Sequence, residues 1–523
     1  MATSVTPQAL SELLASEAPH ALLDVREQGE YNAAHIPGAR WLPRRLIELD
    51  ARKLVPFAGT RPVVCDDDGR RAGLAAATLE RMGYGDTAVL EGGLNRWTTD
   101  GLATEWGLNV PSKAFGESVL AQGSLTEVSP DELHAWLAGG EEVLLLDART
   151  PEEHAAATIP GSRSLPGGEL ALRFRDLPSA PSTRVVVHCA GRTRSIIGAR
   201  TLQRMGVGGV HALRNGTMGW TMAGYALEKG PTRTGLPSST PHTTAEAATR
   251  AQAMAEEDGV RFLSVGGLRA LMATSDTQNV YLIDPRTREE YAGGHIPGFR
   301  WFPGGQAVQR ADEVMAVRQG HVVFSCDGTV RAGVTGSWFR QMGFPHVYAV
   351  HGGTPGWSAA GHDIERGMPD EPPFGFEEAM AAVAFVSPTQ LLQQLGADAG
   401  PAVIFVGTSR EFTEGHVPGA RWHPRGWLEY EVPDALRSKA SAATLTCADG
   451  VQSTLAGATM RGLGYERVTV LRGGMGAWRE AGLATESGLV GVATPPQDVV
   501  ATGTERTPAE MMHYLRWEEE LGR

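Results

Sequence analysis

Four short apolar runs, each followed directly by a cysteine, form the main pattern of the sequence. Short runs rich in β-branched residues are typical of buried strands. After each cysteine a turn of small residues leads into apolar positions at helical spacing, and a glycine ends each predicted helix. The chain therefore repeats one unit of strand, loop and helix four times. The runs are Pro62–Val64, Val185–His188, Val322–Ser325 and Ala443–Thr446, the cysteines are Cys65, Cys189, Cys326 and Cys447, and the glycines are Gly83, Gly206, Gly343 and Gly464.

The sequence on both sides of each cysteine repeats in step with it. Upstream lie an Asp-x-Arg segment and a turn of the form His-Ile-Pro-Gly, and downstream a glycine turn leads to a tryptophan. Strands that alternate with helices indicate a parallel α/β sheet with helices on both faces. The first segment is Asp24–Arg26, Asp147–Arg149, Asp284–Arg286 and, departing from the pattern, Phe405–Gly407; the turns begin at His35, Thr158, His295 and His416; the tryptophans are Trp97, Trp220, Trp357 and Trp478.

This combination resembles the rhodanese domain. The resemblance implies four tandem rhodanese-like domains of the α/β class, each a small, mostly parallel sheet flanked by helices on both faces. The polar segment 231–258 is predicted to be a linker that divides the chain into two pairs of domains. A capping box, Thr507 to Glu510, predicts a terminal helix that packs on a domain. We expect the domains to span residues 1–110, 124–230, 259–368 and 384–490, with a tail at 491–523.

Composition and charge narrow the range of partners. The chain has 523 residues and a net charge of −13, so it has no basic field to attract nucleic acid. No apolar run approaches the roughly 20 residues that cross a bilayer, and the N-terminal residues lack a signal-peptide pattern, so we expect a cytoplasmic protein without a membrane partner. The four cysteines include no C-x-x-C pair, which argues against a disulfide framework and a structural zinc site. No metal or cofactor is predicted.

The rhodanese resemblance implies that the cysteine of the loop is a nucleophile. It would take a sulfane sulfur from a small donor such as thiosulfate, hold it as a persulfide, and pass it to a thiol, to cyanide or to a protein acceptor. Backbone N–H groups at a helix N-terminus, together with an arginine, favour the thiolate that this chemistry needs. The catalytic candidates, in decreasing order, are Cys189, Cys326, Cys65 and Cys447.

The charge of each loop sets this order. The second loop carries two arginines and no acid, so we expect its amides to surround a sulfur that solvent can reach. The third loop has Arg331 but also Asp327, and the first loop has three aspartates beside its arginines. Carboxylates raise the pKa of a nearby thiol, and the fourth loop has Gln452 in place of an arginine. The predicted substrate-binding residues are Ala190, Gly191, Arg192, Thr193, Arg194, Ser195, Arg331 and Arg70.

Two other functions are alternatives to this prediction, and several other residues are candidates for a role in the site. A phosphatase or arsenate reductase would need an arginine six residues after the cysteine, which only Arg71 provides. A binding scaffold or sulfur carrier would follow if some repeats have lost their chemistry. His188 neighbours Cys189 in a strand, where successive side chains point to opposite faces, so it is not expected to activate the sulfur. The turn histidines, the Asp-x-Arg pairs and the tryptophans are predicted to be structural.

Overall fold

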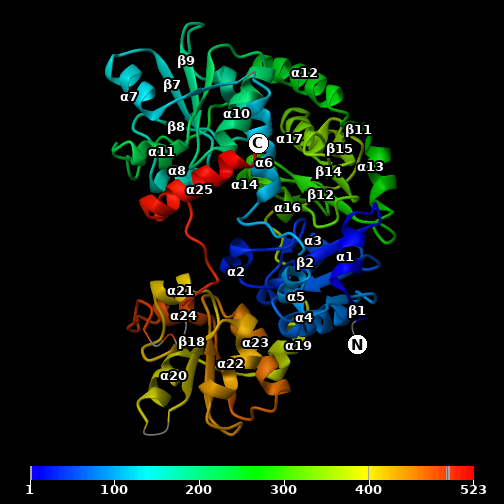
Figure 1. Cartoon of the computed structure of the whole chain (residues 1–523), viewed down its shortest axis with the longest axis vertical. Coiled ribbons are helices and arrows are strands. Elements are labelled where there is room, and N and C mark those ends of the chain that lie inside the picture. Colours follow the sequence, from blue (N-terminus) through cyan, green and yellow to red (C-terminus); the bar gives the residue numbers. More distant parts are fainter. Residues whose placement is uncertain (1–2, 124, 398–399, 491, 493–494, 523) are drawn as a thin grey trace. The chain divides into compact units, whose positions relative to one another are not determined.

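Each of the four repeats forms its own five-stranded parallel sheet, which confirms the predicted fold class. The computed structural model describes residues 3–123, 125–397, 400–490, 492 and 495–522 (Figure 1). Residues 124 and 491, where we expect the second domain and the tail to begin, lie outside these ranges. Within every sheet the strands, counted along the repeat, lie in the order first, fifth, fourth, second, third.

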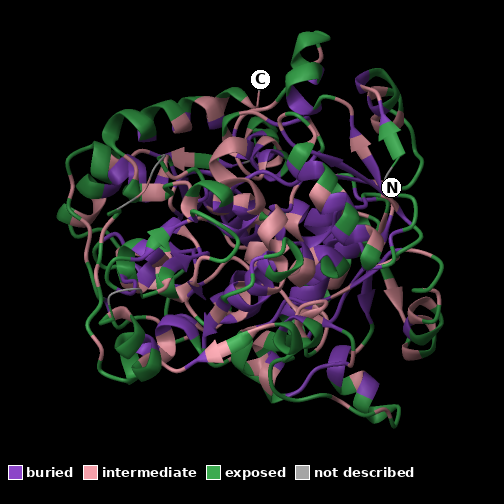
Figure 2. Ribbon diagram, turned by 90° about the horizontal axis from the view of Figure 1, so that it is seen from below, coloured by how far each residue is buried: buried purple, intermediate pink, exposed green. Residues whose placement is uncertain are grey.

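The fourth strand of each repeat is central in its sheet, and it is the apolar run seen in the sequence. All residues of the four apolar runs are buried, and Figure 2 shows how buried and exposed residues are distributed over the ribbon. The strands of repeat 1 are β1 (Thr3–Val5), β2 (His20–Asp24), β3 (Arg40–Trp41), β4 (Arg61–Cys65) and β5 (Ala88–Leu90). Those of repeat 2 are β6 (Thr126–Val128), β7 (Val143–Asp147), β8 (Arg163–Ser164), β9 (Arg184–His188) and β10 (Val210–Leu213). Those of repeat 3 are β11 (Arg261–Leu263), β12 (Val280–Asp284), β13 (Arg300–Trp301), β14 (His321–Phe324) and β15 (His346–Val350). Those of repeat 4 are β16 (Ala384–Val386), β17 (Ala402–Phe405), β18 (Arg421–Trp422), β19 (Ala443–Thr446) and β20 (Val468–Leu471).

Helices flank each sheet, and their ends follow local sequence signals. Each helix after the cysteine loop stops before a glycine with a positive φ of 79–103°, as predicted. Repeat 1 has α1 (Pro7–Leu14), α2 (Gln28–Ala33), η1 (Arg44–Leu46), α3 (Ile47–Leu54), α4 (Arg70–Arg81) and α5 (Gly93–Thr99). Repeat 2 has α7 (Pro130–Ala138), α8 (Pro151–Ala156), α9 (Leu170–Arg173), η2 (Phe174–Asp176), α10 (Thr193–Arg204) and α11 (Gly216–Met222). Repeat 3 has α13 (Val265–Met272), α14 (Arg288–Gly293), α15 (Gly304–Gln309), α16 (Ala311–Val314), α17 (Val330–Gln341) and α18 (Gly353–Ala359). Repeat 4 has α20 (Pro388–Leu395), α21 (Ser409–Glu414), η3 (Arg425–Trp427), α22 (Leu428–Ala435), α23 (Val451–Gly462) and α24 (Gly474–Glu480).

The connections between repeats also contain helices. The predicted linker 231–258 contains α12 (Pro241–Glu257), which buries Ala247, Ala251 and Met254 against α17. The linker prediction is therefore wrong in part, since these small apolar residues at helical spacing form a packed face. In the same way α6 (Val110–Ala121) packs on α10, and α19 (Phe376–Ala382) packs on α23. The predicted capping box opens α25 (Pro508–Glu520), which follows the short η4 (Gly503–Glu505).

The repeats associate in a different way from the one we expected. One compact unit comprises residues 1–52, 58–108 and 370–500, which contain repeats 1 and 4. The other comprises residues 53–57, 109–369 and 501–523, which contain repeats 2 and 3 and α25. The segment 231–258 therefore joins two paired repeats and does not divide the chain into two pairs.

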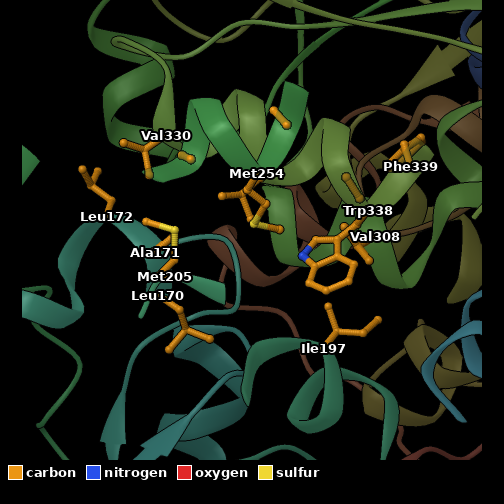
Figure 3. Close-up of a cluster of buried hydrophobic side chains, with 14 of the residues drawn as sticks. Leu170, Ala171, Leu172, Ile197, Met205, Met254, Val308, Val330, Trp338 and Phe339 are labelled. Carbon is orange, nitrogen blue, oxygen red and sulfur yellow. The ribbon is translucent and has the colours of Figure 1, made fainter. Parts of the chain in front are cut away.

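Repeats 2 and 3 share one hydrophobic core. Leu170 and Ile197 of repeat 2 lie in the same cluster as Val308 and Trp338 of repeat 3 (Figure 3). Two glycine pairs, 167–168 and 304–305, bring the backbones of the two repeats into direct contact. A Cβ added at Gly168 would lie 2.9 Å from the backbone nitrogen of the facing glycine, so only glycine fits there.

Repeats 1 and 4 pair through the same face with different chemistry. Arg44 and Arg425 are equivalent in position to Gly167 and Gly304 of the other unit. In each repeat the backbone amide of this residue donates to the carbonyl group of the residue directly after the second strand. Each arginine binds a glutamate of the other repeat. Arg44 Nη1 lies 2.6 Å from Glu429 Oε2, and Arg425 Nη2 lies 2.5 Å from Glu48 Oε1.

Candidate functional site

The loop after the central strand opens with an equivalent residue in each repeat. The carbonyl group of that residue accepts a hydrogen bond of 2.7–2.8 Å from the helix that follows the glycine turn. The accepting residues are Asp66, Cys189, Cys326 and Cys447, and the donors are Leu94, Thr217, Thr354 and Met475.

Cys65 lies one residue earlier in its repeat than the other three cysteines lie in theirs. Cys65 is the last residue of β4 and pairs with Asp24, as His188 at the end of β9 pairs with Asp147. The first loop therefore opens with an aspartate, Asp66, and the thiol lies in the sheet. Burial, followed by the charge of Asp24, raises the pKa of Cys65 well above its ordinary value.

Asp66 fills the first loop with its own carboxylate. Its two oxygens accept hydrogen bonds from the amides of Gly69 at 2.5 Å, Arg71 at 2.7 Å and Ala72 at 3.1 Å. Main-chain amides at a helix N-terminus are a general binding site for an anion. In repeat 1 this site is thus occupied by a residue of the loop itself.

In repeats 1, 2 and 3 the arginine five residues after the loop-opening residue is held in an ion pair. Arg71, Arg194 and Arg331 each pair with a glutamate in the helix after the second strand, at closest distances of 2.5–2.7 Å. The partners are Glu30, Glu153 and Glu290, the third residues of α2, α8 and α14. Among the other predicted substrate-binding residues, Arg70 pairs with Asp68 at 2.8 Å on the exposed side of the first loop.

Cys189 is covered, which differs from the open loop that we expected. Its side chain is 2% exposed, and its sulfur lies 3.6 Å from the hydroxyl group of Ser195. Burial raises the pKa of the Cys189 thiol, although Arg194 and Ser195 act in the opposite direction. Arg192 is 3% exposed and pairs with Glu117 at 2.6 Å, so the loop's positive charge is compensated.

The covering residues come from α25, from η4 before it and from Met218 of α11, which would lie 3.0 Å from a Cβ at Gly191. Glu518 Oε1 accepts hydrogen bonds from the Thr193 hydroxyl group at 2.6 Å and from the Thr193 amide at 3.4 Å. A Cβ added at Gly191 would lie 3.3 Å from Glu518 Oε2 and 3.6 Å from the ring of Tyr514. A Cβ added at Gly503 would lie 3.5 Å from Ala190. Sequence patterns predicted the helix but gave no signal for its place over this loop.

Cys326 is fully buried in the third repeat. Burial, followed by the charge of Asp327, raises the pKa of its thiol to about 11. Arg331 is held by Asp327 at 2.8 Å and by Glu169 of repeat 2 at 3.0 Å.

Cys447, ranked last from the sequence, is 1% exposed, and its loop has the main-chain arrangement expected of a reactive cysteine. Its sulfur accepts hydrogen bonds from the amides of Gly450 at 3.2 Å and Ser453 at 3.4 Å, and it lies 3.5 Å from Asp449 Oδ1. Gly450 adopts a φ of +96°, a conformation that glycine tolerates best and that lets its amide face the sulfur. Burial raises the pKa of the Cys447 thiol, and the hydrogen bonds from Ser453 oppose this.

A pocket opens beside Cys447 within the unit of repeats 1 and 4. Its volume is about 200 Å³. Gln452, which replaces the arginine of the other loops, donates to the carbonyl group of Arg45 at 3.1 Å. The lining residues include Arg45, Leu49, Thr408, Glu411, Cys447 and Gln452.

The remaining candidates are structural, as predicted. The Asp-x-Arg pairs are buried ion pairs in which the arginine also binds a carbonyl group of the next turn, as Arg149 does with Ala157 at 2.6 Å. The turn histidines stack on a ring four residues earlier, as His35 does on Tyr31 at 3.9 Å. Each of the four tryptophans is at most 7% exposed and donates its indole N–H to a carbonyl group.

Two other kinds of feature are absent from the described residues. No group of three or more His, Cys, Asp or Glu side chains there could hold a metal ion. None of the helices in this part of the chain has the length and apolar character to span a membrane.

Four sheets of one topology, each with a loop between its central strand and a helix, define the class of protein. The family model described as "Rhodanese-like domain" matches residues 6–100, 129–223, 264–360 and 387–481, so the chain belongs to the rhodanese-like family and contains four such domains.

Individual relatives support this assignment. The crystal structure of a thiosulfate sulfurtransferase from Pseudomonas aeruginosa is 38% identical with a TM-score of 0.90, and the match covers 99% of this chain and 97% of that one. A sulfurtransferase of Allochromatium vinosum is 34% identical over 103 residues, which are 20% of this chain and 94% of that protein. A thiosulfate sulfurtransferase of Azotobacter vinelandii is 26% identical over 215 residues, covering 33% of this chain and 78% of that protein.

Proposed function

We propose that the protein is a sulfurtransferase that moves a sulfane sulfur from a small donor such as thiosulfate to a thiol or cyanide through a cysteine persulfide. The names of its relatives support sulfur transfer in general. The observation that carries the proposal is the Cys447 sulfur, which accepts two main-chain N–H bonds and lines a pocket. Amides placed in this way stabilise a thiolate and the persulfide anion that replaces it.

The reaction has two halves. The cysteine thiolate attacks the outer sulfur of thiosulfate, the S–S bond of the donor breaks, and sulfite leaves with the bonding electron pair. The enzyme then holds a persulfide. Cyanide or a thiolate attacks the outer sulfur of this persulfide, which releases thiocyanate or a new persulfide and restores the cysteine thiolate.

The geometry changes the order in which we rank the cysteines. Cys447 comes first, because two main-chain amides face its sulfur and it lines a pocket, although its side chain is as buried as that of Cys189. Cys189 comes second, because its loop matches but α25 covers it. Cys326 follows, since it is fully buried with a thiol pKa of about 11. Cys65 comes last, because it lies one residue before the loop.

The phosphatase and scaffold alternatives differ in how well the described loops support them. An arginine six residues after a loop cysteine was the motif for a phosphatase, but Arg71 lies five residues after Asp66, as the other arginines do after their cysteines. The motif is therefore absent from the described loops. A scaffold role fits repeat 1, whose loop holds a carboxylate in place of a thiol.

Persulfide mapping on the full chain tests the proposal. After exposure to thiosulfate, mass spectrometry should find one added sulfur on Cys447, and Cys447→Ser should remove most of the thiocyanate formed with cyanide. Cys65→Ser is the matched control, and we expect it to retain activity. Equal sulfur on all four cysteines, or full activity in the Cys447→Ser and Cys189→Ser double variant, would refute the assignment.

A further inference from the structure

We propose that α25 is an autoinhibitory segment that closes the Cys189 loop, with the Glu518 carboxylate in the position of the anionic substrate. The inference rests on the proposed function, because it concerns access of a sulfur donor to one of its cysteines. Four observations carry it.

The first observation is the place of the carboxylate. Thr193 is the first residue of α10, and its amide and hydroxyl group both donate to Glu518, which is only 1% exposed. The N-terminus of a helix attracts an anion, and a thiosulfate dianion approaching Cys189 would need the same N–H groups. Glu518 therefore competes with the donor for one position.

The second observation comes from repeat 1 of the same chain. There Asp66 occupies the position equivalent to Cys189, and its carboxylate accepts three amide hydrogen bonds from the loop and the first turn of the helix. A carboxylate can thus satisfy this type of loop in this protein. Repeat 1 holds it permanently, whereas repeat 2 receives it from a distant segment.

The third observation concerns the arginines that should attract a donor. Glu519, next to Glu518, pairs with Arg192 at 3.3 Å and with Arg214 at 3.0 Å. The two glutamates of α25 therefore cancel positive charge at the loop as well as covering it.

The fourth observation is that α25 lies outside the large hydrophobic core of its unit. Its apolar part consists of Met511, Leu515 and the partly buried Tyr514, which pack on Met218 of α11. Arg506, just before the helix, lies 3.9 Å from the ring of Tyr514. Lys113 of α6 also lies 5.8 Å from the ring of Tyr514 and 5.6 Å from that of Trp517. The large core shared by repeats 2 and 3 contains no residue of α25, so displacement of the helix would leave that core in place.

Alkylation of Cys189 by iodoacetamide in the full chain tests the cover without relying on sulfur transfer. We expect the rate at Cys189, followed by mass spectrometry, to rise at least tenfold in Glu518→Gln and in Leu515→Ala. Glu520→Gln is the matched control, because Glu520 is an exposed carboxylate of the same helix, and it should alkylate as the wild type does. Cys326 should stay unreactive in every variant, which shows that the core remains folded.

Thiosulfate loading of Cys189 in the Cys447→Ser background provides the second measurement. We expect Glu518→Gln to increase the persulfide on Cys189 by a similar factor. An unchanged alkylation rate at Cys189 in both variants would overturn the inference, and so would faster alkylation combined with reduced loading, because Glu518 would then assist the reaction. Faster alkylation with no sulfur on any cysteine would support the cover and refute the sulfurtransferase proposal.

Discussion

Replacing Asp66 by alanine should destabilise the unit of repeats 1 and 4 by about 3 kcal/mol. The carboxylate is 1% exposed and satisfies three amides, and a buried amide left without a partner costs about 1–3 kcal/mol. Three such amides set an upper range of about 3–9 kcal/mol. Burial raises the pKa of Asp66, which means that desolvation of the charged carboxylate already costs free energy in the wild type and reduces the net loss on substitution. Water that enters the space left by the carboxylate would satisfy some of the amides and reduce the loss further.

Calorimetry and hydrogen exchange on the full chain measure this effect. Because the chain has two compact units, unfolding need not be a single transition, and the amides of Gly69, Arg71 and Ala72 provide a local readout. These amides should exchange much faster in Asp66→Ala. Asp68→Ala is the control, since that carboxylate is 43% exposed and surface contacts are worth about 0.5 kcal/mol. A loss below about 1 kcal/mol with protection unchanged would refute the reasoning.

Two further predictions concern a thiol and an ion pair. Because burial raises the pKa of Cys447 above the ordinary value of about 8.5, its iodoacetamide alkylation rate should rise about tenfold per pH unit between pH 6 and 8; a plateau below pH 7 would contradict this. Arg425→Ala leaves the buried Glu48 without its partner, which should cost about 3–5 kcal/mol in denaturant unfolding at pH 7. Burial alone would raise the pKa of Glu48, but Arg425 lowers it below its ordinary value. The ion pair therefore stabilises the folded protein at pH values above the unfolded carboxyl pKa of about 4.3. This contribution is lost as the pH falls below that value. A difference between variant and wild type that stays constant down to pH 3 would argue against the pair.

Much of each repeat could be predicted because local signals determine it. Apolar β-branched runs give the central strands, glycines end the helices after the loops, and the capping box at Thr507 opens α25. The tryptophans are core residues, as predicted. These features depend on a few neighbouring residues, so the sequence displays them directly.

The start of the first loop was harder to place. Cys65 and Asp66 are adjacent, and both are compatible with the end of a buried strand. A second spacing would have resolved the choice, because Asp66 lies as far before Gly93 as Cys189 lies before Gly216, whereas Cys65 lies one residue further away. The cysteine pattern alone concealed this shift.

Contacts between distant segments account for the rest. The partners of Arg192 and Thr193 include Glu117, Glu518 and Glu519, which lie 75 or more residues away along the chain. Counting charges within the loop therefore overestimated its positive field. No local pattern indicates that repeat 2 pairs with repeat 3, or that a terminal helix covers Cys189.

The two kinds of pairing face have a consequence for the order in which the chain assembles. Repeat 1 leaves the ribosome first and meets repeat 2 long before repeat 4 exists. The tight backbone contact is made at Gly168, whose place in repeat 1 is taken by Arg45, so repeat 1 cannot form the glycine contact through which repeats 2 and 3 pair. Repeats 2 and 3 pair as neighbours in the chain, whereas the charged partners of repeat 1, Arg425 and Glu429, come only with repeat 4.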